Sequence, residues 1–220
     1  MIQLSTFRFL TTLKNNNNKA WFDAHRNLYE NAKEDFSSTV DAIIKAIAKF
    51  DEPIGVLKSK DCTFRINRDV RFSANKTPYK NNLAAAFSKG GKKATIAGYY
   101  FHCEPGKSFV AGGFYNPMPD QLAKLRQEID YNFDEWLKII NNKKFKSQFV
   151  KGVEGSGSLV RPPKGYDENN PAISFLKMKG FLVEKEFSDA ELQDKNAVKK
   201  IAQSFEAMKP IIDFLNRAVE

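Results

Sequence analysis

The chain has few of the residues that bind metals or form disulfides. Its 220 residues include two cysteines, Cys62 and Cys103, and two histidines, His25 and His102. Secreted proteins of this size more often carry several disulfides, so we expect free thiols, a reducing compartment and a cytoplasmic location. A catalytic zinc site usually needs three protein ligands, and neighbours such as His102 and Cys103 point to opposite faces of a strand. We therefore expect no metal site and no cofactor.

Long apolar runs and nucleotide-binding motifs are also missing. No run approaches the roughly 18 residues of a membrane-spanning helix, so we expect no transmembrane segment and no membrane partner. The first residues, Met1–Leu10, include Arg8 and lack a long apolar stretch, which argues against a signal peptide. The glycines at 152–157 are not followed by Gly-Lys-Ser/Thr, so they do not form a phosphate-binding loop of that type.

Apolar residues, by contrast, are plentiful. The chain contains 19 phenylalanines, and hydrophobic residues make up 42% of it, which is enough for a sizeable core without a metal or disulfide. There is no internal repeat, linker or low-complexity tract. We therefore predict that residues 1–220 form a single domain.

The spacing of apolar residues predicts helices at both ends of the chain and strands between them. Helical spacing is found near Ser5, over Lys19–Phe50 and Pro119–Asn141, after Asn170, and beyond a capping box at Ser188–Glu191, with a kink near Pro210. Strand patterns are found at Ile54–Lys58, Thr63–Phe72, Leu83–Ser88, Ala94–Cys103, Ser108–Tyr115 and, as an edge strand, Phe181–Phe187. The predicted fold is α+β, with a central, mostly antiparallel sheet at about residues 54–115 packed by N-terminal and C-terminal helices.

Positive charge is concentrated in one segment. The formal net charge is +9, and residues 58–93 hold ten Lys or Arg against two Asp or Glu. Residues 1–57 hold seven of each sign, and residues 94–220 hold eighteen against seventeen. A concentrated positive field attracts anionic ligands, although a lysine-rich surface can also be solvated without any partner.

The predicted strand Thr63–Phe72 contains an unusual arginine. Its even positions are apolar except for Arg68, and its odd positions include Asp69 between other polar residues. A guanidinium among apolar side chains is unfavourable unless it is paired and hydrogen-bonded. Either a bulge turns Arg68 outward, or Arg68 lies under the sheet with a carboxylate partner.

The loop that follows adds more cations and hydroxyl groups. Arginine can bind phosphate or carboxylate through two parallel hydrogen bonds, whereas lysine acts as a point charge. The candidate anion-binding residues are Arg65, Arg68, Arg71, Lys76, Tyr79 and Lys80, and the candidate catalytic residue is Asp69. Alternatively, Asp69 only pairs with Arg65 or Arg71 to fix the sheet, and the loop is only a basic turn.

Several runs of this sequence resemble a protein family. The runs FRINRDVRFS (64–73) and KTPYK (76–80) resemble the hallmark of a bacterial family of unknown function that also has members in fungi. The resemblance continues in YYFH (99–102), EPG (104–106), GGFY (112–115) and RPPKGY (161–166), and at Phe9-Leu10, Asn17-Asn18 and Trp21-Phe22. Asn75 stands where such relatives commonly have Asp, which removes a possible second carboxylate. The resemblance implies a single domain and no particular activity.

The first functional hypothesis is an anion- or phosphate-binding module whose partner is a nucleic acid, bound through the basic segment 58–93. Cations of this segment would contact phosphates, and Tyr79 would stack on a base.

The alternative is an enzyme acting on a small phosphorylated or carboxylated substrate. Asp69 would act as base or orienting group, and the substrate's anionic group would be held by Arg68, Arg71 and Lys80. A third possibility is that these charges form a structural lattice and that the site lies elsewhere, for example at Arg161–Tyr166.

Overall fold

The computed structural model describes all residues, 1–220, and its chain folds into two compact units. The first consists of Met1–Lys92, Tyr100–Val110 and Glu186–Gln203, and the second of Lys93–Tyr99, Ala111–Lys185 and Ser204–Glu220. The prediction that residues 1–220 form a single domain stays a prediction.

The structure confirms the predicted α+β fold. Four strands form one antiparallel sheet in the order β1-β2-β3-β4. They are β1 (Leu83–Phe87), β2 (Gly98–Cys103), β3 (Ser108–Phe114) and β4 (Phe181–Phe187), so Phe181–Phe187 is an edge strand as predicted. Between residues 54 and 115, the range predicted for the sheet, the first strand begins only at Leu83.

Two predicted strands were wrong. Ile54–Lys58 lies largely in a 3₁₀-helix, η1 (Glu52–Val56), in which Pro53 occupies one of the first positions. Proline presets a backbone angle that suits the start of a helix, where its missing N–H is not needed. Residues 63–72 pair with a returning segment at isolated points and do not form a regular strand.

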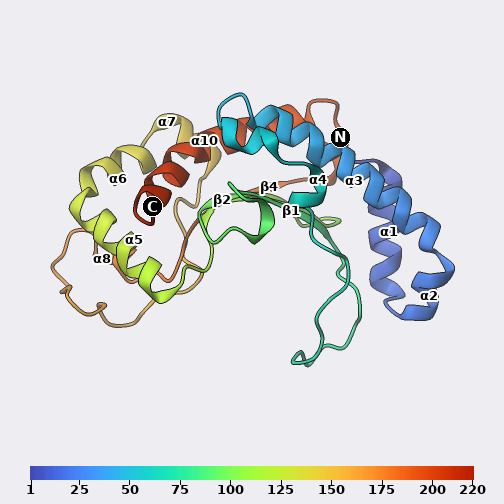
Figure 1. Ribbon diagram of the computed structural model, residues 1–220, viewed down its shortest axis with the longest axis horizontal. Coiled ribbons are helices and arrows are strands. Elements are labelled where there is room, and N and C mark those ends of the chain that lie inside the picture. Colours follow the sequence, from blue (N-terminus) through green and yellow to red (C-terminus); the bar gives the residue numbers. More distant parts are fainter. The chain divides into compact units, whose positions relative to one another are not determined.

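In the first unit, helices pack on the sheet (Figure 1). They are α1 (Leu4–Asn15), α2 (Lys19–Ala24), α3 (Arg26–Ile47), α4 (Ser59–Cys62), α9 (Asp189–Gln193) and the part of α10 (Ala197–Arg217) that ends at Gln203. The ring of Phe36 on α3 stacks on Phe101 of β2, with ring centroids 5.6 Å apart. The predicted helix Lys19–Phe50 is interrupted at His25, and it ends three residues early.

In the second unit, aromatic side chains build a separate core around Trp136. The helices are α5 (Pro119–Tyr131), α6 (Phe133–Ile140), α7 (Lys143–Gln148), α8 (Ile173–Leu176) and the part of α10 (Ala197–Arg217) that begins at Ser204. The indole of Trp136 is fully buried and contacts the rings of Phe175, Phe181 and Phe214. The predicted helix Pro119–Asn141 is interrupted at Asn132.

Local signals at two positions are confirmed. The Ser188 hydroxyl accepts from the amide of Glu191, and the Glu191 carboxylate accepts from the amide of Ser188, as a capping box requires. The turn between β2 and β3 contains Gly106 at φ +70°, a conformation that glycine adopts without strain. No helix of the structure is both long and apolar enough to cross a membrane.

Candidate functional site

Residues 63–82 form a long arm that doubles back on itself, here called the basic arm. The amide of Arg68 donates to the carbonyl of Pro78 (2.9 Å), and the amide of Lys80 donates to that of Ile66 (2.8 Å). Because Pro78 has no N–H, it cannot donate a backbone hydrogen bond across the arm, and few backbone hydrogen bonds join the two segments of the arm. Figure 1 shows the arm in teal, extending away from β1 within the first unit.

The pairing of the two sides changes register near the base of the arm. The amide of Phe64 donates to Ala84 (3.0 Å), whereas Ile66 accepts from Lys80. From Phe64 to Ile66 the chain advances by two residues, whereas the paired segment from Lys80 to Ala84 advances by four. The two extra residues, 81–82, lie outside the ladder, and their side chains are free to bond elsewhere in the unit.

Burial along the first side follows the predicted alternation as far as Val70. The odd positions 65, 67, 69 and 71 are exposed, whereas the even positions 64, 66, 68 and 70 are buried or half-buried. Phe72 breaks the pattern, because it is 97% exposed rather than on an apolar face.

The arm is attached to the helices of its own unit at Tyr79. The Asn17 side chain accepts from the amide of Tyr79 (3.0 Å) and donates to its carbonyl (2.9 Å), like a neighbouring strand. The Tyr79 ring stacks on Phe22, with centroids 4.0 Å apart, and Tyr79 is only 6% exposed. Tyr79 is therefore an anchor of the arm, and its ring is not available to stack on a base.

Arg68 braces the tip of the arm. Its guanidinium donates to the carbonyl of Thr77 (3.0 Å), to the Thr77 hydroxyl and to the hydroxyl of Ser73 (3.3 Å). These partners are neutral oxygens, so neither expected arrangement of Arg68 is found, and no carboxylate pairs with it. Hydrogen bonds of this kind satisfy the half-buried guanidinium and fix the loop that it spans.

Asp69 and Arg71 form a two-point ion pair on the exposed side of the tip. Arg71 Nε donates to Asp69 Oδ1 (3.0 Å), and Nη2 donates to Oδ2 (2.7 Å). Hydrogen bonds from Arg71 lower the pKa of the Asp69 carboxyl and raise the pKa of Arg71. Asp69 therefore stays ionised and orients Arg71. Lys76 donates to the carbonyls of Val70 (3.0 Å) and Arg71 (3.4 Å), which closes the loop.

Two cations at the base of the arm make no hydrogen bond or ion pair with a carboxylate. Arg65 is exposed, and its charge contributes to the lowered pKa of Asp69 without direct contact. Lys80 is half-buried, with Nζ 5.5 Å from the centroid of the Phe64 ring. Burial, and secondarily the charge of Arg65, lowers the pKa of Lys80. An anion placed between these two cations would relieve their repulsion.

A polar cluster that the sequence analysis missed lies on β2 beside the base of the arm. His102 Nε2 is 3.1 Å from Glu104 Oε2, and Nδ1 is 3.2 Å from the Tyr100 hydroxyl and 3.3 Å from Asn82 Nδ2. An ionised carboxylate can only accept, so the neutral imidazole that satisfies every partner carries its proton on Nε2. The imidazole also stacks on Phe109, with centroids 4.7 Å apart.

The sequence contained a signal for this cluster. Tyr100, His102 and Glu104 are spaced by two, so a strand brings them to one face. The expectation for His102 concerned only a metal site with Cys103, and no role was predicted for Glu104. The cluster adjoins the arm through Phe64, whose ring centroid is 6.4 Å from that of Tyr100.

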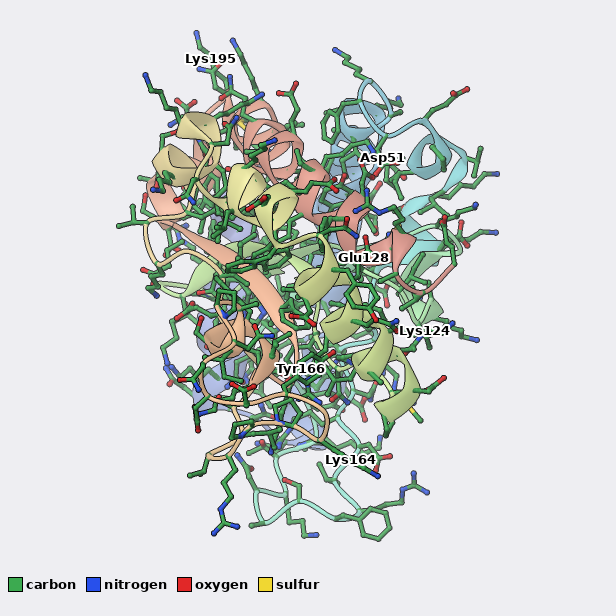
Figure 2. The ribbon with its side chains drawn as sticks, turned by 90° about the vertical axis from the view of Figure 1, so that its left-hand side faces the viewer. Asp51, Lys124, Glu128, Lys164, Tyr166 and Lys195 are labelled. Atoms are coloured by element: carbon green, nitrogen blue, oxygen red, sulfur yellow. The ribbon has the colours of Figure 1, made fainter.

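The remaining candidates lie apart from one another. Cys62 and Cys103 are buried free thiols, and no group of three or more His, Cys, Asp or Glu is arranged to hold a metal ion. In the second unit, Figure 2 shows Lys164 and Tyr166 on the loop that precedes α8. Arg161 and Lys164 of this loop are exposed, and the third hypothesis stays untested.

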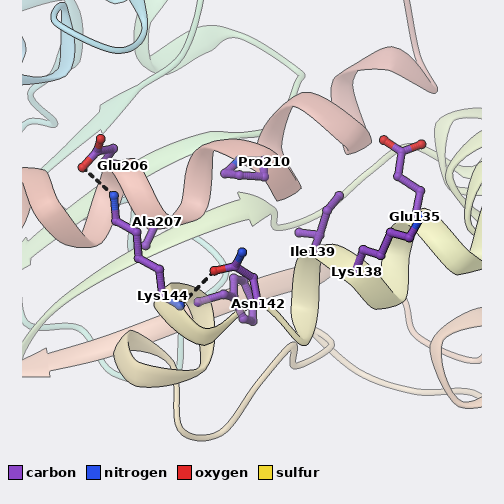
Figure 3. A pocket seen from close by; sticks show the side chains of 9 residues that line it. Glu135, Lys138, Ile139, Asn142, Lys144, Glu206, Ala207 and Pro210 are labelled. Atoms are coloured by element: carbon purple, nitrogen blue, oxygen red, sulfur yellow. Dashed lines mark hydrogen bonds and ion pairs between the residues drawn. The ribbon is translucent and has the colours of Figure 1, made fainter.

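The second unit also contains a hollow of about 350 Å³ (Figure 3). Lys144 on its wall donates to Glu206 (2.8 Å), and the amide of Lys144 donates to Asn142. Glu135 lines it as well. Because its wall carries charges of both signs, it does not resemble a cradle for an anion.

Comparison with known proteins identifies the family. A family model described as "conserved hypothetical protein (DUF2461)" matches residues 5–214. The chain belongs to the DUF2461 family. The match includes residues of both compact units and the whole basic arm. It confirms that the chain belongs to a family of unknown function, as the resemblance in the sequence predicted. No curated protein and no solved structure matches the chain.

Proposed function

We propose that this DUF2461 protein is an anion-binding module that binds a nucleic acid through its basic segment 58–93. The observation that carries the proposal is the basic arm, which holds five Lys or Arg and one acidic residue on an extended, braced hairpin.

The electrostatics of the arm support contact with phosphates. Asp69 is the arm's single carboxylate, so the five cations of the arm leave a formal net charge of +4, and Arg71 stays exposed while it is bonded to Asp69. Arg65 and Lys80 make no hydrogen bond or ion pair with a carboxylate, and further lysines of the segment, such as Lys58 and Lys60 at the base, are exposed. Phosphates that these cations neutralise would release counterions, so binding would weaken steeply with salt.

The test is fluorescence anisotropy of labelled single- and double-stranded oligonucleotides with the purified protein over a salt series. Arg65→Ala removes an exposed, unpaired cation, so we expect weaker binding and a logarithmic salt slope reduced by about 0.7–0.9. Lys195→Ala removes an exposed cation of the same unit outside the arm and should change neither quantity. Absence of binding at low salt, or equal losses in both variants, would refute the proposal.

The second candidate function is an enzyme acting on a small phosphorylated or carboxylated substrate. The observation that favours it is the cluster of Tyr100, His102 and Glu104, in which a base is oriented by a carboxylate and bonded to a hydroxyl group. Such an arrangement can move a proton. Asp69 fits the role of a base poorly, because its bonds to Arg71 keep it ionised and engaged.

This candidate is tested by screening phosphorylated and carboxylated metabolites for a shift of the melting temperature. A substrate of this site should stabilise the native protein and lose that effect in His102→Gln and Lys80→Met. His25→Gln is the matched control, since His25 is the chain's other histidine. Stabilisation that survives His102→Gln and Lys80→Met would exclude the site from this role.

A further inference from the structure

Phe72 is the most exposed large apolar side chain of the protein. It is 97% exposed, and it lies at the tip of the basic arm, where the amide of Ser73 donates to the carbonyl of Val70 (3.3 Å) in a tight turn. A phenyl ring in water is unfavourable, and an exposed aromatic residue beside cations is a common element of sites that bind single strands.

The loop that carries Phe72 is fixed on both sides. Arg68 bonds Thr77 and Ser73 across the loop, and Lys76 bonds the carbonyls that precede Phe72. The Arg71 guanidinium, held by its carboxylate partner, lies 5.8 Å from the centroid of the Phe72 ring. The ring is therefore presented by a braced loop, next to a cation that can reach a phosphate.

We propose that Phe72 stacks on an unpaired base of a single-stranded nucleic acid, while Arg71 and Lys76 contact the adjacent phosphates. This inference rests on the proposed function and names its partner. Every base has a π-face, so stacking of this kind tolerates any sequence. Tyr79, the aromatic residue first expected to stack, is buried, so Phe72 takes that role.

Two other partners fit the tip less well. In a duplex both faces of each base are covered, and a wedge must first separate two stacked pairs. A membrane would have to hold the tip by one ring, because Val70 is half-buried and Ser73, Asn75 and Thr77 are polar. Even one long acyl chain gives only marginal membrane binding, so a single ring is a weak anchor.

The experiment compares two probes that carry the same number of phosphates, a labelled oligothymidylate and inorganic polyphosphate. A labelled duplex and phosphatidylserine vesicles are added to test the two other partners. Phe72→Ala should weaken oligothymidylate binding by about 5- to 150-fold, the range of one lost base stack. It should leave polyphosphate binding and the salt slope unchanged. Phe72→Trp should retain binding. Tyr131→Ala, which removes a ring that is 75% exposed in the second unit, should change nothing.

The outcomes separate this inference from the function on which it rests. If the native protein binds both probes and Phe72→Ala binds them equally well, the anion-binding function stands and the stacking role is refuted. If Phe72→Ala weakens only duplex binding, or only binding to phosphatidylserine vesicles, the partner is a different one and the inference is wrong. If the native protein binds neither probe, both proposals fail.

Discussion

The attachment of the basic arm through Asn17 leads to a prediction about stability. Asn17→Ala removes three hydrogen bonds: two with the backbone of Tyr79, at 3.0 and 2.9 Å, and one to the Asn81 side chain, at 3.1 Å. The partners are 62 and 64 residues away in sequence. The Asn17 side chain therefore ties the loop that follows helix α1 to the arm, beside the stacking of Phe22 on Tyr79.

The size of the effect follows from these contacts. A net 0.5–1.5 kcal/mol for each of the three hydrogen bonds gives a loss of about 1.5–4.5 kcal/mol in the free energy of unfolding. For a chain of this length each kcal/mol lowers the melting temperature by about 2–4 °C, so we expect a decrease of about 3–18 °C. Both backbone groups of Tyr79 lose their partner, which favours the upper part of the range.

Urea unfolding and hydrogen exchange measure the two consequences. In Asn17→Ala the urea concentration at the unfolding midpoint should fall. The amide of Tyr79 should also exchange faster in the native state, because it no longer has a hydrogen bond to Asn17 that must break before exchange. Asn15→Ala is the control, since Asn15 is exposed and its side chain makes no hydrogen bond. Equal unfolding free energies for the two variants, with unchanged exchange at Tyr79, would refute the reasoning.

Three further predictions concern single residues. Burial lowers the pKa of Lys80, so between the lowered pKa and pH 10.5 the Lys80 side chain binds more protons in the unfolded chain than in the native protein. The free energy of unfolding should therefore rise as the pH approaches 10.5. Lys80→Met should abolish this rise, which is measured by denaturation at about pH 7 and about pH 10. Burial raises the pKa of Cys62 to about 12 and raises that of Cys103 too, so thiol reagents at pH 8 should label neither until the protein unfolds. Gly113→Ala would force a Cβ into the carbonyl oxygen of Phe181 at φ +126°, so calorimetry should show that the free energy of unfolding falls by at least about 2 kcal/mol.

Features that depend on neighbours in sequence could be predicted. The edge strand Phe181–Phe187 and the capping box at Ser188 follow from alternation and from short-range hydrogen bonding, and both are confirmed. The concentration of charge in residues 58–93 is a property of composition alone. The alternation of burial also holds through Val70, although this segment is not a regular strand.

Features that depend on distant contacts could not be predicted. Asn17 had no predicted role beyond its place in the family resemblance, yet its side chain bonds Tyr79, 62 residues away in sequence. The buried position of Tyr79 depends on Phe22, which lies on α2. The change of register near residues 81–82 frees Asn82 to bond His102, and no local pattern encodes that shift.

The contacts within the arm also limit what its charge can do. Ten cations in residues 58–93 would give a logarithmic salt slope of about −7 on a single strand if each met a phosphate. Arg68 is occupied inside the loop, and the cations that the arm leaves accessible are Arg65, Arg71, Lys76 and Lys80. Four contacts correspond to a slope of about −3. A measured slope near −3 would indicate binding by the arm alone, whereas a slope near −6 would require all five lysines of residues 58–93 that lie outside the arm and would contradict an interface confined to the arm.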